Sequence, residues 1–409
     1  MANAILNTSL VLNEGISILE NELVAGAMVH ADYSDEFQNV GSTVNIRRPA
    51  QYTVQRDNLD ITSGIQDIEQ ATIPVTLDKT ATIAIKLTAK ERTLSFDRFS
   101  EDILKPAMVQ MKDEIEQHIA SLYPKFYHFL GTPGTVPSTF LALGGVGSVM
   151  TDQAVPLSGR MALHGTDASL ALADGLKGVF VQDMAKTALA EAKIGKYANF
   201  ENYTWVHAPT HTVGPLGGTP LVNGGAQAVT YAASKQTWSQ TFITDGWTAA
   251  AAARVKAGDV FTVPNVFAVN PVSKQSTGRL QTFTILNDGS SDGSGNLTLT
   301  ISPPMITSGA FQTVTAAPAD NAALTIKTGT AGTGYKQSLL FNKNAITLVT
   351  RALDIPQGQG LRTTTKTGNR VTVSCTEFMD GKTLEQTMRF DMLYQATVID
   401  PRLGARLTA

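Results

Sequence analysis

The sequence predicts an α+β protein with a small all-β domain inserted into a body of mixed helices and strands. Three observations predict this class. Apolar residues recur at the three- and four-residue spacing of helices over 1–37 and 99–130. They alternate with polar residues, as strands do, over much of 40–92 and after 339. Between about 256 and 304, short strand-like runs with turns every 8–12 residues are typical of a small barrel or sandwich.

The composition favours a protein whose surface is largely covered by partners. Charged residues make up 16% of the 409 residues, against about 25% in ordinary globular proteins. The net charge of −3 gives no basic field for gripping nucleic acid. The one cysteine, Cys375, excludes an internal disulfide framework and a thiolate zinc cage, and is expected to be a small core residue. With no visible secretory signal or membrane span, we expect maturation in a reducing, cytosol-like compartment.

Residues 1–37 are predicted to form an amphipathic N-terminal helix. Leu10, Ile16 and Leu19 belong to its apolar stripe. Such a helix either lies on its own core or acts as an arm that packs on a neighbouring subunit, and the sequence leaves both possibilities open. These three side chains are therefore candidates for an inter-subunit contact.

Residues 40–92 are predicted to form a long β-hairpin. Its strand pattern is carried by alternating apolar residues, namely Val44, Ile46, Tyr52, Val54, Ile73, Val75, Leu77, Ile83, Ile85 and Leu87. The polar, acidic stretch 56–70 has too few apolar residues for a core. Because an isolated two-stranded ribbon is only marginally stable in water, this hairpin needs an external surface to lie on.

Charged residues along the hairpin are candidates for contacts across a repeating interface. A solvated charged face would contribute little free energy to a solitary protein. Charge pairs between copies would fix register and the choice of partner, and this reading is favoured. The candidates are Arg47, Arg48, Arg56, Asp57, Asp60, Asp67 and Glu69.

The remaining helices and strands follow from local pattern. The longest helix is predicted over 99–130, with a kink or break at Pro106 or Pro124. A helix is predicted to begin at Thr166 or Asp167 and end near 180. Other predicted segments are a second helix over 182–193, a strand containing Tyr203 and Trp205, a short helix near 248–255, and strands over 339–353, 369–378 and 383–399.

No residue pattern predicts catalysis or a bound cofactor. His207 and His211 have the spacing of a helical metal pair, but Pro209 lies between them. The run 288–293 is similar to the start of a calcium loop, yet Leu299 stands where that loop needs a bidentate glutamate. We therefore expect no enzyme activity, cofactor, metal or small-molecule substrate.

Three runs of sequence carry a family resemblance. They are EAKIGKYANFENYTWVHAP (191–209), KAGDVFTVPNVFAVNP (256–271) with the later LTISPP, and the closing segment 344–407. In order and pattern they resemble the major capsid proteins of tailed bacteriophages, which have the Hong Kong 97-like fold. The likeness is strongest to the coat-protein family of Salmonella-type podoviruses, with its inserted telokin-like β domain. The closing segment contains that family's R-x-D-x-x-Y pattern, as Arg389, Asp391 and Tyr394, and ends on Asp400, Pro401 and Arg402.

The resemblance implies a division of the chain into named parts. These are an N-terminal arm (1–39), an extended β-hairpin (40–92), a peripheral domain with a long spine helix (93–156), an axial domain (157–222 and 340–409) and an inserted β-rich domain (223–339).

The function implied by the resemblance is that of a major capsid protein of a tailed double-stranded DNA phage. Such subunits would self-assemble, through a procapsid, into the pentamers and hexamers of an icosahedral shell. The implied partners are other copies of the chain, a scaffolding protein, a portal and weakly contacted packaged DNA, with no membrane. The implied location is the virion, with host cytoplasm during assembly. The alternative is a β-rich tail or surface binding protein of the adhesin type, which the Thr/Gly/Ser-rich middle of the chain would suit.

Overall fold

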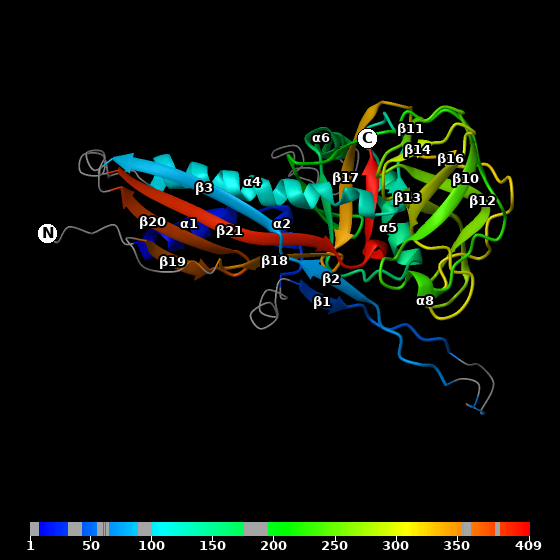
Figure 1. The fold of residues 1–409 in the computed structure, drawn as a ribbon, viewed down its shortest axis with the longest axis horizontal. Helices are drawn as coiled ribbons and strands as arrows, with labels where there is room; N and C mark the ends of the chain where they lie inside the picture. Colours follow the sequence, from blue (N-terminus) through cyan, green and yellow to red (C-terminus); the bar gives the residue numbers. More distant parts are fainter. Residues whose placement is uncertain are drawn as a thin grey trace. The chain divides into compact units, whose positions relative to one another are not determined.

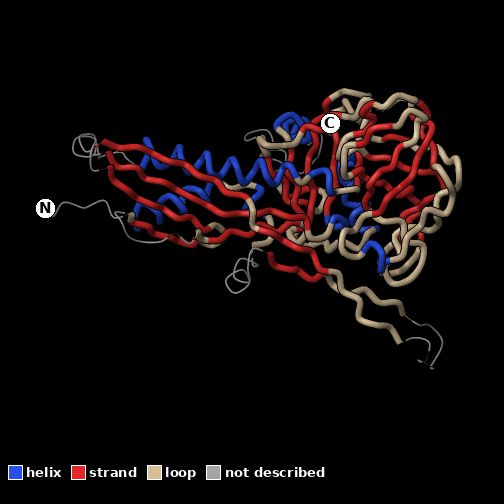
Figure 2. The backbone as a smooth tube through the Cα atoms, viewed as in Figure 1, coloured by secondary structure: helices blue, strands red, loops and turns tan. Residues whose placement is uncertain are grey.

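The computed structural model describes residues 8–31, 43–54, 60, 62, 65–88, 100–175, 195–353, 355, 361–380 and 385–409. The chain divides into two compact units. The first comprises Met1–Asn45, Pro74–Ala120 and Ile346–Thr397, and the second comprises Ile46–Ile73, Ser121–Ala345 and Val398–Ala409. Helices and strands occur in both units, which confirms the predicted α+β class (Figures 1 and 2).

A five-stranded sheet forms the β-layer of the first unit. Its strands are β3 (Lys79–Thr88), β18 (Ile346–Arg351), β19 (Arg362–Thr367), β20 (Thr372–Asp380) and β21 (Glu385–Val398). The long strand β21 pairs antiparallel with β20 and, through ten residue pairs, with β3. The sequence prediction placed the β3 residues in the hairpin, and this is wrong. A two-residue period indicates a strand but does not identify its partner.

Helices cover this sheet. They are α1 (Thr8–Glu22), α2 (Ala25–Met28), a π-helical turn (Ser100–Leu104) and α4 (Lys105–Ser121). Helix α1 packs on β19 and β20, and α4 is held to β21 by a 2.9 Å hydrogen bond from the Tyr394 hydroxyl to Glu114. Pro106 lies in the first turn of α4, where a missing N–H costs no helical hydrogen bond.

The predicted helix over 99–130 ends earlier than expected. After Ser121 the chain forms a short 3₁₀ turn, η4 (Tyr123–Lys125), around Pro124, and then enters strand β4 (His128–Leu130). The break at Pro124 is therefore confirmed, and the extension of the helix to 130 is wrong. Proline removes the backbone donor that another helical turn would use.

A buried carboxylate fixes the N-terminal segment to α4. Glu116 is completely buried, and its two oxygens accept the backbone N–H groups of Val24, Ala25 and Gly26 at 2.9, 3.0 and 3.1 Å. These charge-assisted hydrogen bonds offset the cost of burying the carboxylate. The link between α1 and α2 is thereby part of the folded core.

The second unit contains a seven-stranded sheet. Its strands are β4, β5 (Arg160–His164), β6 (Lys196–Tyr197), β7 (Phe200–Thr204), β8 (Thr210–Thr212), β17 (Gly334–Asn342) and β22 (Gly404–Thr408). Helix α5 (Phe140–Asp152) packs on β4 and β22 and buries Leu143, Val146 and Met150 against Phe200 and Leu407. The sequence pattern does not predict α5, because three glycines interrupt its apolar residues.

Helix α6 (Thr166–Gly175) begins at the predicted residue, whereas the helix predicted over 182–193 lies outside the described residues. None of the helices in the described ranges is both long enough and apolar enough to cross a membrane.

A small barrel forms the other part of the second unit. Its strands run in the order β16 (Thr325–Ile326), β12 (Val260–Val269), β13 (Ser276–Ile285), β15 (Leu297–Ser302), β10 (Gln240–Trp247) and β9 (Gly218–Val222). The segment just before β16 bridges back to β9, at Leu221 and Ala323, and so closes the sheet (Figure 1). The interior is filled by apolar side chains that include Phe242, Phe261 and Phe283.

The predicted helix near 248–255 is wrong. Residues Ala252–Val255 form strand β11, which pairs with β14 (Gly289–Ser291). The local helix is instead α8 (Tyr231–Ser234). Alanine favours helices intrinsically, but here tertiary pairing with β14 overrides that preference.

Candidate functional site: a projecting hairpin and the cavity at its base

The hairpin begins as a regular two-stranded sheet and then loses its backbone pairing. Strands β1 (Thr43–Arg47) and β2 (Thr72–Thr76) pair with each other, and the backbone bond from Arg48 N–H to the Ala71 carbonyl, 2.8 Å, extends this pairing. Beyond it, 49–54 and 65–70 are not strands. In Figure 1 these two legs continue together from β1 and β2.

One glutamine side chain links the two legs where the backbones do not pair. The Gln66 amide oxygen accepts the backbone N–H and the hydroxyl of Thr53 at 2.8 and 3.0 Å. The Gln66 amide nitrogen donates to the Thr53 carbonyl at 2.7 Å. All of these groups are exposed, so competing water weakens each bond.

Large apolar side chains on the legs are open to solvent. Val54 is 83% exposed, Ile65 75% and Ile68 73%, and Tyr52 is also exposed. Neighbouring exposed apolar groups on a thin ribbon are unusual in a solitary soluble protein and typically mark an interaction surface. These apolar side chains are therefore left uncovered by the described part of their own chain.

The charged residues predicted on the hairpin fall into three groups. Arg47, Asp60, Asp67 and Glu69 are exposed. The Asp60 carboxylate accepts the backbone N–H and the hydroxyl of Thr62, and these bonds hold its pKa below the ordinary value. Arg56 and Asp57 lie outside the described residues.

Whereas Arg47 is exposed, Arg48 is half-buried and contacts its own subunit. Its Nε donates to the Ile399 carbonyl at 3.0 Å, and its guanidinium lies 5.3 Å from the centre of the Trp238 ring. Burial lowers the pKa of Arg48. This side chain joins the base of the hairpin to the barrel.

The candidate contacts on the N-terminal helix are placed differently from the hairpin residues. Ile16 and Leu19 are buried in the first unit, with Leu19 completely covered. Their own subunit covers them, because α1 packs on β19 and β20. Leu10 belongs to α1, but its side chain lies outside the described part of the chain.

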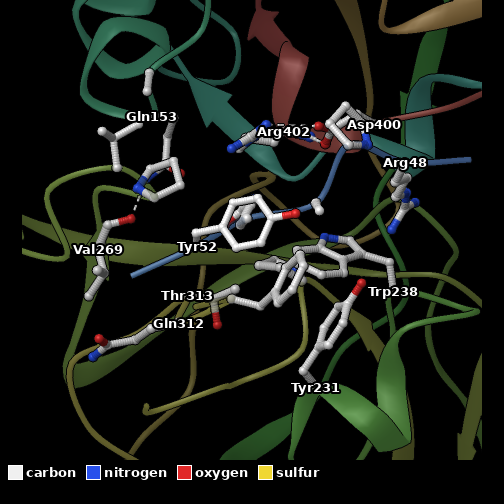
Figure 3. Close-up of a pocket in the computed structure, with 18 of the residues that line it drawn as sticks. Arg48, Tyr52, Gln153, Tyr231, Trp238, Val269, Gln312, Thr313, Asp400 and Arg402 are labelled. Carbon is white, nitrogen blue, oxygen red and sulfur yellow. Dashed lines mark hydrogen bonds and ion pairs between the residues drawn. The ribbon is translucent and has the colours of Figure 1, made fainter. Parts of the chain in front are cut away.

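A cavity of about 380 Å³ opens at the base of the hairpin (Figure 3). Its walls come from the hairpin, the barrel, the C-terminal end of α5 and the turn before the C-terminal strand. The labelled side chains are Arg48, Tyr52, Gln153, Tyr231, Trp238, Val269, Gln312, Thr313, Asp400 and Arg402. The ring of Tyr231 stacks on Phe311, with 3.5 Å between ring centres. Asp400 accepts the Arg402 backbone N–H at 3.0 Å and its guanidinium at 3.1 Å.

A buried group of polar residues around His211 could not be predicted from the sequence. His211, predicted to be structural or incidental, is buried on β8, with its Nε2 2.9 Å from Asp259 and its Nδ1 3.0 Å from the Tyr123 hydroxyl. Asp259 also accepts N–H groups from Gly214 and Lys256. These partners are far apart in sequence, so no local motif could reveal them.

The arrangement around His211 is structural. The Asp259 carboxylate accepts hydrogen bonds from several donors. The nearby Arg406 is completely buried, and its guanidinium donates to the Gly258 carbonyl at 2.9 Å. Among the described residues, no group of three or more His, Cys, Asp or Glu could hold a metal ion. The buried polar groups join the barrel to the seven-stranded sheet within the second unit.

A family model described as "P22 coat protein - gene protein 5" matches residues 1–409 of the chain. The chain belongs to the P22 coat protein family. It is a phage capsid protein, and the predicted function of major capsid protein is confirmed, whereas the adhesin alternative is not favoured. The family is one of structural proteins, and its members reside in the virion.

Individual relatives of this coat protein are distant. The major capsid protein of Acyrthosiphon pisum secondary endosymbiont phage 1 is 25% identical over 388 residues, which cover 90% of this chain and 89% of the relative. A solved structure from Mycobacterium phage Che8 covers 94% of this chain and 90% of its own, with 11% identity and a TM-score of 0.46. The solved CUS-3 coat protein I-domain is 25% identical, with 28% of this chain and all of that domain covered and a TM-score of 0.20.

Proposed function

We propose that this coat protein builds a closed shell by laying its hairpin on a neighbouring copy. The observation that carries the proposal is the pair of legs 49–54 and 65–70, which are not strands and which expose Val54, Ile65 and Ile68. Burying one such side chain contributes about 1.5–3 kcal/mol. Contacts of this size add through avidity when every subunit of a ring makes them.

The finer parts of the proposal rest on family membership and on the layout of the chain. Copies would form the pentamers and hexamers of an icosahedral shell that encloses double-stranded DNA, because heterologous contacts close into rings. A scaffolding protein and a portal would assist assembly in host cytoplasm. The net charge of −3 suits a wall that contacts DNA only weakly.

Family membership also supports the Hong Kong 97-like arrangement and its domains. In the predicted division, α4 would be the spine helix of the peripheral domain (93–156), and residues 157–222 and 340–409 would form the axial domain. The barrel, from β9 at Gly218 to β16 at Ile326, would be the core of the inserted domain predicted over 223–339.

Deletion of residues 55–70 tests the role of the hairpin. The shortened chain should remain a folded, soluble subunit, because the described residues of the removed segment, 60, 62 and 65–70, are exposed. It should fail to form normal shells in electron micrographs, when produced under conditions in which the intact chain assembles. Normal shells from the deleted chain would contradict the proposal. Circular dichroism and the urea midpoint of the purified subunit establish that the fold is intact.

A further inference from the structure

Two residues that line the cavity at the base of the hairpin carry shielded hydrogen-bond donors. The donors are the indole Nε1 of Trp238 and the guanidinium Nε of Arg402, and neither has an acceptor within the described part of the chain. A donor that has lost its water and gained no partner is unfavourable. Two such donors at one cavity therefore favour an occupant that carries hydrogen-bond acceptors.

The described residues around the cavity carry a net positive charge. The charged ones are two arginines, Arg48 and Arg402, and one carboxylate, Asp400, so the net charge is +1. Asp400 accepts the backbone N–H of Arg402 at 3.0 Å and its Nη2 at 3.1 Å, but it does not reach the Nε. Burial lowers the pKa of Arg48, because a cation is poorly solvated there, and a neighbouring anion would offset that cost. An anionic acceptor therefore suits this cavity better than a neutral one.

Aromatic rings give the cavity apolar walls. Tyr231 stacks on Phe311 with 3.5 Å between ring centres, and Trp238 meets the Tyr231 ring edge-on at 6.4 Å. Tyr52 lines the cavity from the hairpin (Figure 3). The volume of about 380 Å³ is in the range of small-molecule sites, which combine apolar walls with a few polar groups. The cavity thus suits an anionic group attached to an apolar body.

We propose that this cavity binds a small organic anion, which has one carboxylate or phosphate group on an apolar body. The anionic oxygens accept hydrogen bonds from Trp238 Nε1 and Arg402 Nε, and the apolar body packs on Tyr231 and Phe311. The anion is a structural ligand rather than a substrate. It joins three segments of the second unit, namely the hairpin at Arg48, the segment before β10 and the turn before β22. Its effect is to fix the base of the hairpin.

Tryptophan fluorescence tests for this ligand on free subunits. Trp238 lines the cavity, whereas Trp205 and Trp247 do not line it and are only 1% and 3% exposed. The intact subunit would be titrated with cyclohexanecarboxylate and with cyclohexyl phosphate, neither of which absorbs where tryptophan does. A saturable change is expected with at least one of them, and the tighter of the two identifies the anionic group. No saturable change with either compound would overturn the proposal and leave water as the occupant.

Two control compounds separate the charge from the apolar body. Cyclohexanol has the ring without the charge, and acetate has the charge without the ring. Each should bind at least about tenfold more weakly than the preferred anion, because each lacks either the charge-assisted hydrogen bonds or the apolar contact. Equal binding of either control compound would contradict the proposed class of ligand.

Substitutions test whether binding occurs in this cavity. Arg402→Met removes the charge and its donors, and Trp238→Phe keeps a ring beneath Arg48 but removes the indole N–H. Each should weaken binding at least about tenfold, measured from the ligand concentration needed to raise the melting temperature. Arg362→Met, at an exposed arginine of β19 in the first unit, is the matched control and should bind like the intact chain. Unchanged binding by both cavity variants, with circular dichroism showing intact folds, would overturn the proposal.

Hydrogen–deuterium exchange tests the effect of the ligand on the hairpin. A saturating concentration of the preferred anion should slow exchange in peptides that cover 46–54 of the free subunit. Peptides from β19, which belongs to the first unit, should exchange as before. Unchanged exchange over 46–54 would contradict the joining of the hairpin to the other two segments.

The chain lacking 55–70 separates this ligand site from the proposed function, on which it does not depend. The deletion keeps every described residue that lines the cavity, so the shortened chain should bind the anion like the intact one. Binding more than about tenfold tighter would mean that the removed segment fills the cavity in the intact chain, and would overturn the proposed ligand. Normal shells from the shortened chain would contradict only the proposed function.

Discussion

The N-terminal helix and the hairpin are both candidate contacts with a neighbouring subunit in the sequence, and they differ in the structure. The first is predicted from a helical apolar stripe and the second from strand alternation around a polar stretch. The structure buries Ile16 and Leu19 of α1 and leaves Ile65 and Ile68 of the hairpin open. Amphipathic pattern therefore shows that a segment needs a covering surface but does not show whether that surface belongs to the same copy.

The difference has an identifiable cause. The N-terminal segment has a buried anchor, since Glu116 accepts three of its backbone N–H groups and α1 lies on β19 and β20. The described part of the hairpin is anchored at its base, through the Arg48–Ala71 bond and the contacts of Arg48 with Ile399 and Trp238, whereas the Gln66 bridge between its legs is exposed to solvent. One segment is thus a part of the subunit's core, and the other is available to a partner.

The largest expected effect on stability comes from a substitution in α1, the buried segment of the two. Leu19→Ala should lower the free energy of unfolding of the subunit by about 3 kcal/mol, because it removes a completely buried side chain and leaves a cavity. Urea unfolding of the purified subunit measures it. A loss below about 1 kcal/mol would show that α1 is not an integral part of the core.

Glu116→Gln should have the next largest effect, about 2 kcal/mol of unfolding free energy. The amide keeps one acceptor but loses the charge and turns an NH₂ group toward backbone donors. Glu22→Gln, at the exposed end of α1, is the matched control and should change stability by less than about 0.5 kcal/mol. Equal effects of Glu116→Gln and Glu22→Gln would show that Glu116 does not anchor the N-terminal segment.

Lowering the pH should destabilise the second unit through the protonation of His128 on unfolding. Burial lowers the pKa of His128 to about 3, from its ordinary 6.5. Between these values the unfolded chain binds a proton that the folded chain does not, so stability falls as the pH drops from about 6.5 toward 3, by up to about 1.4 kcal/mol per pH unit. His128→Asn should flatten this slope in urea titrations from pH 7 to 5. A slope unchanged by the substitution would exclude His128 as its source.

The smallest stability effect is expected on the hairpin. Ile68→Ala removes a side chain that is 73% exposed, so the unfolding free energy of the isolated subunit should change by less than about 0.5 kcal/mol. The same substitution should raise the concentration needed for assembly, as light scattering measures. A subunit strongly destabilised by Ile68→Ala would mean that the hairpin packs on its own copy.

Several elements could be predicted from sequence because their signals are local. The start of α6 at Thr166, the break at Pro124 and the buried strand position of Cys375 follow from capping, proline geometry and apolar alternation. The barrel was visible through its regular turns. Helix α5 was not, because its glycines weaken a pattern that packing on β4 and β22 restores.

The candidate site could be predicted only in part, because sequence patterns report local structure and the site joins distant segments. The hairpin's polarity was readable along the chain, so its exposure was expected. The cavity joins Arg48, Trp238 and Arg402, which lie about 160–350 positions apart by their numbering, and His211 and Asp259 meet only through the sheet and barrel. Such contacts depend on tertiary structure, which the periodicity of the sequence does not encode. The same holds for the pairing of β3 with β21.

Hydrogen–deuterium exchange, measured on unassembled subunits and on shells, tests the central contrast most directly. Peptides from 48–71 should exchange rapidly in free subunits and become protected in shells, while peptides from α1 should be protected in both. A hairpin that is already protected in the free subunit, or that still exchanges rapidly in the shell, would contradict the account.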